Sequence, residues 1–309
     1  MKVLLLSMND WAGLGSILTK SLRSVGVDAR IYTSNKGKYK HPSLSIRKSE
    51  MLKFSEECDV IQFMHSEKPN VNINLKGKKV VVFHGGGRFR NKYKEVCSIF
   101  NPIVDASLIQ TYDLFNLGAK NEIWLLPPFD TLSVKPVYET KGDKIIVGHY
   151  PSSTYGKGSD TINRMIKHIK ELVPEFEYRY SPDHVSWKDQ IKRMSEVDIY
   201  IERMSMNKIE KGGALMRTGV WGMTALEAAS LGKIVVTNFY GRKYYKKEFG
   251  SYALQVANSE KDMTELLIKL LTTPKADLMP LKIASRKWVT ENHSLKVVGE
   301  RLRGIYERL

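Results

Sequence analysis

The stretch KVLLLSMNDWAGLGS, residues 2–16, joins a short apolar run to a glycine-containing turn, and residues 17–24 continue with helical spacing. A buried strand, a tight turn and a helix form the repeating unit of a parallel sheet that is covered by helices. Runs rich in Val and Ile alternate with amphipathic stretches through most of the chain. In the first half, this alternation predicts strands at 2–7, 29–33, 60–65, 79–84, 106–110 and 122–126.

The alternation starts again in the second half, where strands are predicted at 144–150, 176–180, 198–202, 233–237 and 253–256. Between the halves, the polar, Pro-containing residues 135–143 have the composition of a linker. A chain of 309 residues is long enough for two domains. The sequence therefore predicts an α/β protein with two Rossmann-like doubly wound domains, at 1–138 and 139–285. A terminal helical segment follows at 286–309, and its packing against the N-terminal domain is one option.

The composition excludes several classes of protein. With 42% hydrophobic residues and 22 Gly, the chain is neither disordered nor collagen-like. Two cysteines, Cys58 and Cys97, cannot form a disulfide framework, so a reduced, cytoplasmic protein is expected. The apolar run at residues 3–6 is far shorter than the roughly 20 residues of a membrane span. The net charge of +16 fits nucleic acid, an anionic membrane surface or a phosphorylated substrate.

The first candidate site is the turn that contains Asp10, Gly13 and Gly15, directly after the first strand. Backbone N–H groups and the positive end of the next helix can bind an anion at such a turn. The spacing does not match G-x-G-x-x-G, because Leu18 stands where the third glycine belongs. A tight turn without a ligand is the alternative.

The second candidate follows the strand at 79–84, where His84 precedes three successive glycines, Arg88 and Arg90. Three glycines favour close approach of a ligand to the backbone. The position of His84 suits acid–base or hydrogen-bonding work, and the two arginines suit a phosphate or carboxylate. The alternative is a flexible loop with solvated arginines.

The third candidate lies between the first strand of the second half and the helix predicted at 161–172. His149, Ser152, Ser153 and Lys157 bring hydroxyls and a cation to a helix N-terminus, as in a phosphate-binding loop. It is not a Walker A loop, because Gly158 follows the lysine. As an alternative, Ser159 or Asp160 would only cap the helix.

The fourth candidate is the stretch WGMTALEAASLGKIVV at residues 221–236, a helix of small residues that leads into a buried strand. Gly222, Met223 and Thr224 open this helix. Glu227 lies about one turn inside it beside apolar neighbours, so its carboxylate needs a partner such as a pair of ligand hydroxyls. Stabilisation of Glu227 by the helix dipole is the alternative.

Taken in order, the four candidates resemble the GT-B glycosyltransferases, and within them the retaining group 1, or family 4, enzymes. The specific stretch is the fourth, where Trp221 stands for a family Phe and the matching residues are Gly222, Thr224, Ala225, Leu226, Glu227, Ala228 and Gly232. The resemblance extends along the whole chain. It implies that a nucleotide sugar binds mainly to the second domain and that the first domain holds a glycan, lipid-linked or small-molecule acceptor. Asp10, Arg88 and Arg90 are the candidate contacts of that acceptor or of an anion.

The resemblance also implies roles for individual residues. Glu227 would hold the ribose hydroxyls of the donor, and Lys157 would neutralise the leaving diphosphate. The backbone at 222–224 would meet the diphosphate or the sugar, and Gly13 would approach the diphosphate from the other domain. His84 would lie beside the transferred sugar, so the expected catalytic residues are His84, Lys157 and Glu227. Hexosyl transfer would need no metal or other cofactor, since fixed cations and helix N-termini stabilise the leaving group.

Three positions depart from the family pattern. The first glutamate of the family motif is Gly219 here, the family arginine that pairs with the lysine is His149, and Ile234 replaces a proline. Arg203 or Arg217 could supply the second cation. These departures leave open a second hypothesis, a GT-B protein that binds nucleotide sugars without catalysis.

The basic charge leaves a third hypothesis, a nucleic-acid binder, which rests on the short basic and aromatic stretches at 88–94 and 242–247. This hypothesis is the least favoured of the three. Further basic clusters lie at 36–40, 47–48 and 76–79 in the expected acceptor domain. They would attract an anionic acceptor or the inner leaflet of a membrane, which favours a cytoplasmic protein with peripheral membrane contact.

Overall fold

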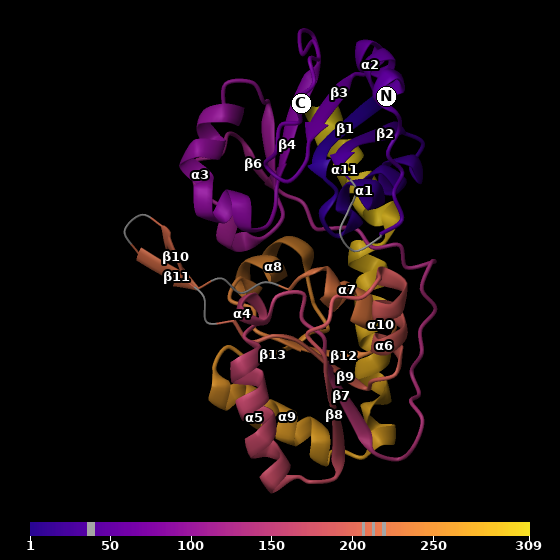
Figure 1. The fold of residues 1–309 in the computed structure, drawn as a ribbon, viewed down its shortest axis with the longest axis vertical. Helices are drawn as coiled ribbons and strands as arrows, with labels where there is room; N and C mark the ends of the chain where they lie inside the picture. Colours follow the sequence, from indigo (N-terminus) through magenta and orange to yellow (C-terminus); the bar gives the residue numbers. More distant parts are fainter. Residues whose placement is uncertain (36–40, 206–207, 212–213, 218–220) are drawn as a thin grey trace. The chain divides into compact units, whose positions relative to one another are not determined.

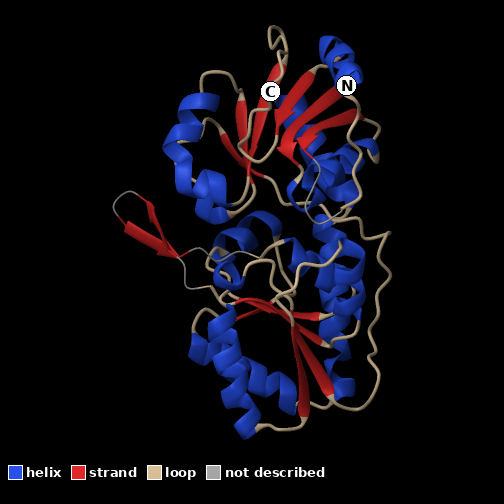
Figure 2. Ribbon diagram, in the orientation of Figure 1, coloured by secondary structure: helices blue, strands red, loops and turns tan. Residues whose placement is uncertain are grey.

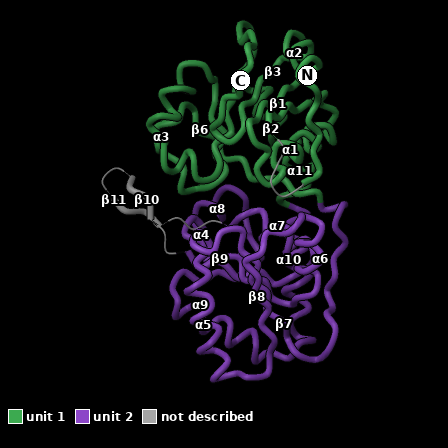
Figure 3. The backbone as a smooth tube through the Cα atoms, in the orientation of Figure 1, with its two compact units in different colours: residues 1–130, 292–309 green, residues 131–291 purple. Residues whose placement is uncertain are grey.

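The computed structural model describes residues 1–35, 41–205, 208–211, 214–217 and 221–309, and it divides into two compact units (Figure 3). Unit 1 consists of Met1–Asp130 and Asn292–Leu309, and unit 2 of Thr131–Glu291. The first boundary therefore lies before the expected linker at 135–143 and not within it. The second lies at 291, after the expected boundary at 285.

Unit 1 contains a six-stranded parallel sheet in the order β2-β1-β3-β4-β5-β6 (Figure 1). The strands are β1 (Lys2–Asn9), β2 (Asp28–Asn35), β3 (Val60–Phe63), β4 (Lys79–His84), β5 (Ala106–Ile109) and β6 (Glu122–Trp124). Its helices are α1 (Leu14–Arg23), α2 (Lys48–Glu57), α3 (Gly87–Phe100) and α11 (Leu295–Arg308), with 3-10 turns at Trp11–Gly13 and Tyr112–Leu114. All six strands that the sequence predicted for this half are present.

Helices cover both faces of this sheet. Phe54 of α2 and Phe89 of α3 belong to the apolar core on one face, together with alternate strand residues such as Leu4 and Val82. On the other face, α11 lies against α1 (Figure 2). Gly299 permits this close approach, because a Cβ at that position would stand 2.2 Å from the backbone oxygen of Ser21. The end of the chain thus completes the core of unit 1.

Unit 2 contains a five-stranded parallel sheet in the order β13-β12-β9-β7-β8. The strands are β7 (Ile145–His149), β8 (Phe176–Tyr180), β9 (Ile199–Arg203), β12 (Ile234–Thr237) and β13 (Gln255–Val256). The helices are α4 (Thr154–Lys157), α5 (Ser159–Leu172), α6 (Trp187–Ser195), α7 (Met223–Ser230), α8 (Arg242–Phe249), α9 (Glu260–Thr272) and α10 (Met279–His293), with a 3-10 turn at Lys275–Leu278. The predicted strands are again present. The antiparallel pair β10 (Lys208–Lys211) and β11 (Ala214–Arg217) was not predicted.

The segment expected to link the domains is held against unit 2. Val137 N donates to the Leu231 oxygen (2.9 Å), and the Tyr138 oxygen accepts from Lys282 (2.7 Å). Thr140 Oγ1 donates to the buried Asp198 (2.8 Å). Composition alone marks residues 135–143 as a linker, but these hydrogen bonds make them part of a domain.

Strand alternation positions the candidate site. Ile199 and Ile201 of β9 face the core that α5 and α9 close, so Tyr200 and Glu202 face the opposite side of the sheet. Helix α7 lies on that side, since the backbone N–H of Gly222, at its N-cap, reaches Glu202. A buried carboxylate therefore lies beside the start of the fourth sequence motif.

Candidate functional site

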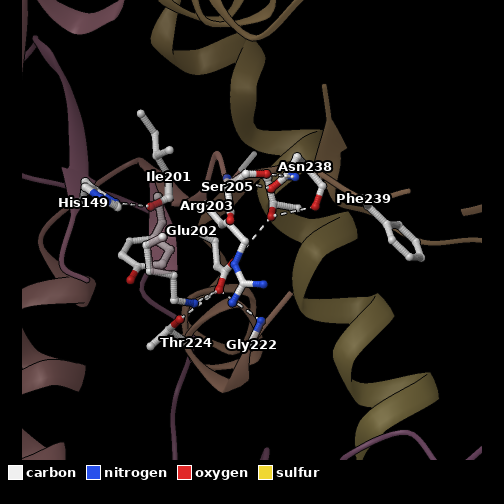
Figure 4. A network of polar contacts seen from close by, with 12 residues as sticks. His149, Ile201, Glu202, Arg203, Ser205, Gly222, Thr224, Asn238 and Phe239 are labelled. Carbon is white, nitrogen blue, oxygen red and sulfur yellow. Dashed lines mark hydrogen bonds and ion pairs between the residues drawn. The ribbon is translucent and has the colours of Figure 1, made fainter. Parts of the chain in front are cut away.

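Polar groups from separate parts of the chain meet at the carboxyl edge of the unit 2 sheet (Figure 4). His149 ends β7, Glu202 lies near the end of β9, and Gly222 precedes α7. Ligands of open α/β sheets bind outside this edge. The third and the fourth sequence motifs meet here.

Glu202 is the centre of this cluster. Its carboxylate forms an ion pair with Lys157 and accepts hydrogen bonds from Gly222 N (3.0 Å) and Thr237 Oγ1 (3.1 Å). Arg203 Nε lies 3.8 Å from its second oxygen. Burial alone would raise the pKa of Glu202, but these charges and donors lower it to about 2. Glu202 is therefore an ionised, fully buried carboxylate.

Lys157 is held in place by its backbone. It ends α4, and its carbonyl oxygen accepts from Met204 N (2.9 Å) at the end of β9. Gly158 follows with φ +70°, and a Cβ there would stand 2.0 Å from the Met204 oxygen, so only glycine fits. Burial lowers the pKa of the Lys157 amine, and Glu202 opposes that effect. The predicted cation is thus present, but it already has a resident counter-ion.

His149 has no capacity left for a ligand. Its Nδ1 lies 2.8 Å from the Ile201 oxygen, which can only accept, so Nδ1 carries the proton. Its Nε2 then accepts from Ser159 Oγ at 2.9 Å. Burial lowers the pKa of His149 to about 4. The neutral, fully buried ring ties β7 to α5 and does not supply the second cation.

Glu227 lies in α7 with 4% of its surface exposed. Among the residues that the structure describes, the one hydrogen bond to its carboxylate comes from Trp187 Nε1, 3.0 Å from Oε1. Burial raises the pKa of Glu227 to about 7, although Trp187 and Lys157 act in the opposite direction. The sequence motif predicted a carboxylate beside apolar neighbours that needs a partner, and in the structure this carboxylate is buried and has Trp187 as a partner.

The remaining predicted donor residues lie around the same edge. Ser152 and Ser153 are exposed, and Ser153 caps α4 by accepting from Gly156 N (3.1 Å). Met223 and Thr224 are half-buried in the first turn of α7. Gly219 and the side chain of Arg217 lie outside the described residues.

In the glycine turn of unit 1, the Asp10 side chain occupies the backbone N–H groups that were expected to bind an anion. The buried Asp10 carboxylate accepts from Gly15 N (2.6 Å), Ser16 N (3.1 Å) and Ser16 Oγ (2.7 Å). Gly13, at φ +65°, precedes α1. Asp10 was predicted to contact an acceptor or anion, but it caps α1 itself and takes the N–H groups that were assigned to a diphosphate.

His84 lies inside the core of unit 1 rather than at a surface. Its ring is fully buried and stacks on Phe89 with the centroids 4.0 Å apart. Its Nδ1 lies 2.9 Å from Ser66 Oγ, and burial lowers its pKa to about 3. The imidazole is therefore neutral and cannot touch a substrate in this conformation. The prediction of a catalytic side chain here is not supported, because position 84 points to the core face of β4.

The two arginines that follow His84 differ in environment. Arg90 is half-buried and pairs with the buried Asp113 at 2.7 Å, whereas Arg88 is exposed and pairs with the exposed Glu95 at 3.3 Å. Arg88 is the more available of the two for an anion. Within the described ranges, no group of three or more His, Cys, Asp or Glu side chains could hold a metal ion.

Sequence reasoning missed two residues of this site, Glu202 and Trp187. Glu202 could have been found, because a carboxylate at the carboxyl end of a predicted buried strand lies where ligands bind. Trp187 carries no such signal. It reaches Glu227 only because α6 packs beside α7, at a separation of 40 residues along the chain.

The sequence matches no protein-family model and no curated protein. Solved structures do match over the full chain. HepE of Anabaena, solved in complex with UDP-glucose, superimposes with a TM-score of 0.65 at 12% identity, and the match covers 100% of both chains. The trehalose-6-phosphate synthase OtsA matches with a TM-score of 0.63 at 10% identity over 99% of both chains.

AviGT4, a glycosyltransferase involved in avilamycin A biosynthesis, matches with a TM-score of 0.60 at 11% identity, covering 100% of this chain and 97% of the other. These structures are GT-B glycosyltransferases. The chain therefore has the fold of that class, with two parallel α/β sheets, as its motifs predicted.

Proposed function

We propose that this chain, which has the GT-B fold, is a glycosyltransferase that moves a sugar from a nucleotide-sugar donor to an acceptor. The observation that carries the proposal is the convergence of Lys157, the N-terminus of α7 and the buried Glu227 at one sheet edge. A cation, a set of backbone N–H groups and a carboxylate are the groups that a diphosphate and a ribose require. HepE, which shares the fold, was solved with UDP-glucose.

The chemistry would be electrostatic. The leaving diphosphate gains charge as the bond to the sugar breaks, and preorganised positive groups stabilise that charge. Lys157 and the N–H groups at the start of α7 would supply the stabilisation, and Glu227 would accept the ribose hydroxyls. Retention, hexosyl specificity and independence of metal belong to the proposal through the resemblance to group 1 enzymes.

Glu202 adds a requirement that the motif did not predict. It already takes Lys157 and Gly222 N, so the diphosphate must share or displace this carboxylate. That same observation favours a second candidate function, a protein that binds nucleotide sugars without turnover. The two differ in whether the positive charge of Lys157 reaches the leaving group.

The acceptor side of the proposal rests on charge. Arg88 and other basic residues of unit 1 would attract an anionic or lipid-linked acceptor at the cytoplasmic membrane surface. No helix within the described parts of the chain is long and apolar enough to cross a bilayer. Nucleic acid is not part of the proposal.

A thermal-shift panel of UDP-, GDP-, ADP- and CMP-sugars tests the donor site. A true donor at 100 times its dissociation constant stabilises the folded chain by about 2.7 kcal/mol. Lys157→Ala and Glu227→Ala should remove the shift, whereas Lys188→Ala, on the exposed side of α6, should keep it. A panel without any shift rejects the proposal.

Turnover separates the two candidate functions. Acceptor-dependent release of the nucleoside diphosphate supports the transferase. Binding without release across a panel of acceptors supports the non-catalytic binder.

A further inference from the structure

Trp187, at the start of α6, contacts Glu227 but has no role in the proposed function. It is the first residue of α6, directly after the N-cap Ser186, whose side chain accepts from Asp189 N (3.2 Å). Gln190 and Met194, three and seven positions further on, are buried. Because these residues share one helix face with Trp187, the packing of α6 aims the indole toward α7.

The indole N–H is the donor to Glu227, at 3.0 Å from Oε1, while the ring itself is half-buried. An ionised carboxylate offers about four acceptor positions on two oxygens. The hydrogen bond from Trp187 orients the carboxylate and occupies one position. Buried polar groups are generally satisfied by protein, water or ligand, so the remaining acceptor capacity of Glu227 suits a ligand with adjacent hydroxyls.

We propose that Trp187 is a positioning residue of the nucleoside subsite, whose indole N–H orients the Glu227 carboxylate to accept both ribose hydroxyls of a nucleoside diphosphate. This inference rests on the proposed function, because it takes Glu227 as the ribose ligand. It adds a residue from α6, outside every motif that the sequence presents. The diphosphate portion of the ligand lies with Lys157 and does not depend on Trp187.

Trp187→Phe removes the N–H and keeps an aromatic ring. The dissociation constant of the variant is measured by calorimetry for the nucleoside diphosphate that the wild-type chain binds in a panel of UDP, GDP, ADP and CDP. Loss of a hydrogen bond to a charged group should weaken this binding about 10-fold. Binding of inorganic pyrophosphate, which has no ribose, should stay unchanged.

Trp288→Phe is the matched control. It also removes an indole hydrogen bond in unit 2, to Tyr245 at 3.0 Å, from a buried ring that does not contact Glu227. The control should bind both ligands as the wild type does. A second test places Trp187→Phe in a Glu227→Gln background, where the substitution should cost no further affinity.

The pH profile distinguishes positioning from a general structural effect. Among the residues that the structure describes, the groups that act on Glu227 are Trp187 from α6, Lys157 from α4 and Tyr200 from β9. Without the indole N–H, the pKa of Glu227 rises, so the affinity lost at pH 7 should return in part at pH 9. Titration of Lys157 would change pyrophosphate binding as well, so the pH profile of pyrophosphate binding is the control for an effect of Lys157.

Each outcome decides between the two claims. If nucleoside diphosphate and pyrophosphate weaken equally, or if the Glu227→Gln background shows the full loss again, Trp187 does not act through Glu227 and the inference is overturned. If the wild-type chain binds no nucleoside diphosphate at all, the proposed function itself fails. A selective, pH-dependent loss supports the inference.

Discussion

At the carboxyl edge of each sheet, a buried carboxylate accepts hydrogen bonds from backbone N–H groups at the start of a helix. The two edges differ in the capacity that they leave for a ligand. In unit 1, Asp10 satisfies the N–H groups of Gly15 and Ser16, and the turn is closed by the chain itself. In unit 2, Glu202 accepts from Gly222 N and also pairs with Lys157. The nearby Glu227 carboxylate accepts one hydrogen bond, from Trp187, among the described residues. An internal carboxylate can replace a ligand at a helix N-terminus, so a glycine turn is evidence of binding only where acceptor or donor capacity remains.

Removing the carboxylate of unit 2 should have the largest effect. Glu202→Ala leaves the buried Lys157 without its counter-ion, and breaking a buried pair in this way costs about 4 kcal/mol of unfolding free energy. Urea unfolding with hydrogen exchange, which assigns the loss to unit 2, measures it. Glu196→Ala, at an exposed pair with Arg179, is the control and should change stability by less than about 0.5 kcal/mol. Equal losses in the two variants would show that Lys157 does not need Glu202.

Asp10→Asn should cause the next largest loss of stability, confined to unit 1. The amide cannot accept all three hydrogen bonds from Gly15 and Ser16, and the lost charge-assisted bonds cost about 2 kcal/mol. The same measurement applies, with the exposed Asp28→Asn as control. If Asp10→Asn instead leaves stability intact and abolishes donor binding, the turn is a ligand site and the contrast between the units is wrong.

Glu227→Gln should stabilise the chain at high pH. The pKa of Glu227 is about 7 in the folded chain and near 4.5 when unfolded, so the ionised buried carboxylate destabilises the fold as pH rises through 7. The neutral amide avoids this penalty, and the variant should exceed the wild type by about 3 kcal/mol at pH 8. The advantage should shrink as pH falls from 7 toward 5.

Melting temperatures across this pH range measure the difference for Glu227→Gln, and nucleotide affinity measured in parallel should fall. A constant difference at every pH would mean that Glu227 does not titrate near 7.

The arginines after His84 should show the smallest effects. Arg90→Ala breaks a half-buried pair and leaves the buried Asp113 without its cation, at a cost of about 1 kcal/mol. Arg88→Ala, at an exposed pair, should stay within about 0.5 kcal/mol of the wild type. For binding to anionic liposomes we expect the opposite order: Arg88→Ala should weaken binding more than Arg90→Ala does. Equal binding of neutral and anionic liposomes by the wild type would remove the membrane proposal.

Much of the fold was predictable because strands and helices reflect local apolar spacing. All eleven predicted strands are present, and β4 and β8 have the predicted bounds. The pair β10 and β11 was missed because β10 (KIEK) is mostly charged and β11 (ALMR) has only three apolar residues, too short a run to predict a strand. The sheet edge that carries Lys157, Gly222 and Glu227 also followed from the order of motifs.

The chemistry at that edge was predictable only in part. His84 and His149 have the residue type of a functional group, yet their rings lie inside the cores and are neutral. A histidine at a strand end faces the core or the surface according to strand register, which a one-residue shift reverses. Glu202 shows the opposite case, a residue without a motif that organises the site.

By itself the sequence determined two α/β domains, the positions of their turns and the presence of a lysine and a glutamate at the second edge, since periodicity and residue type are local properties. The tertiary structure alone decided which carboxylate meets which donor. Glu202 and Lys157 are 45 residues apart, and Trp187 and Glu227 are 40 apart. Such pairs form only when separate strands and helices pack, and burial then decides which charges are neutralised and which acceptor remains open to a ligand.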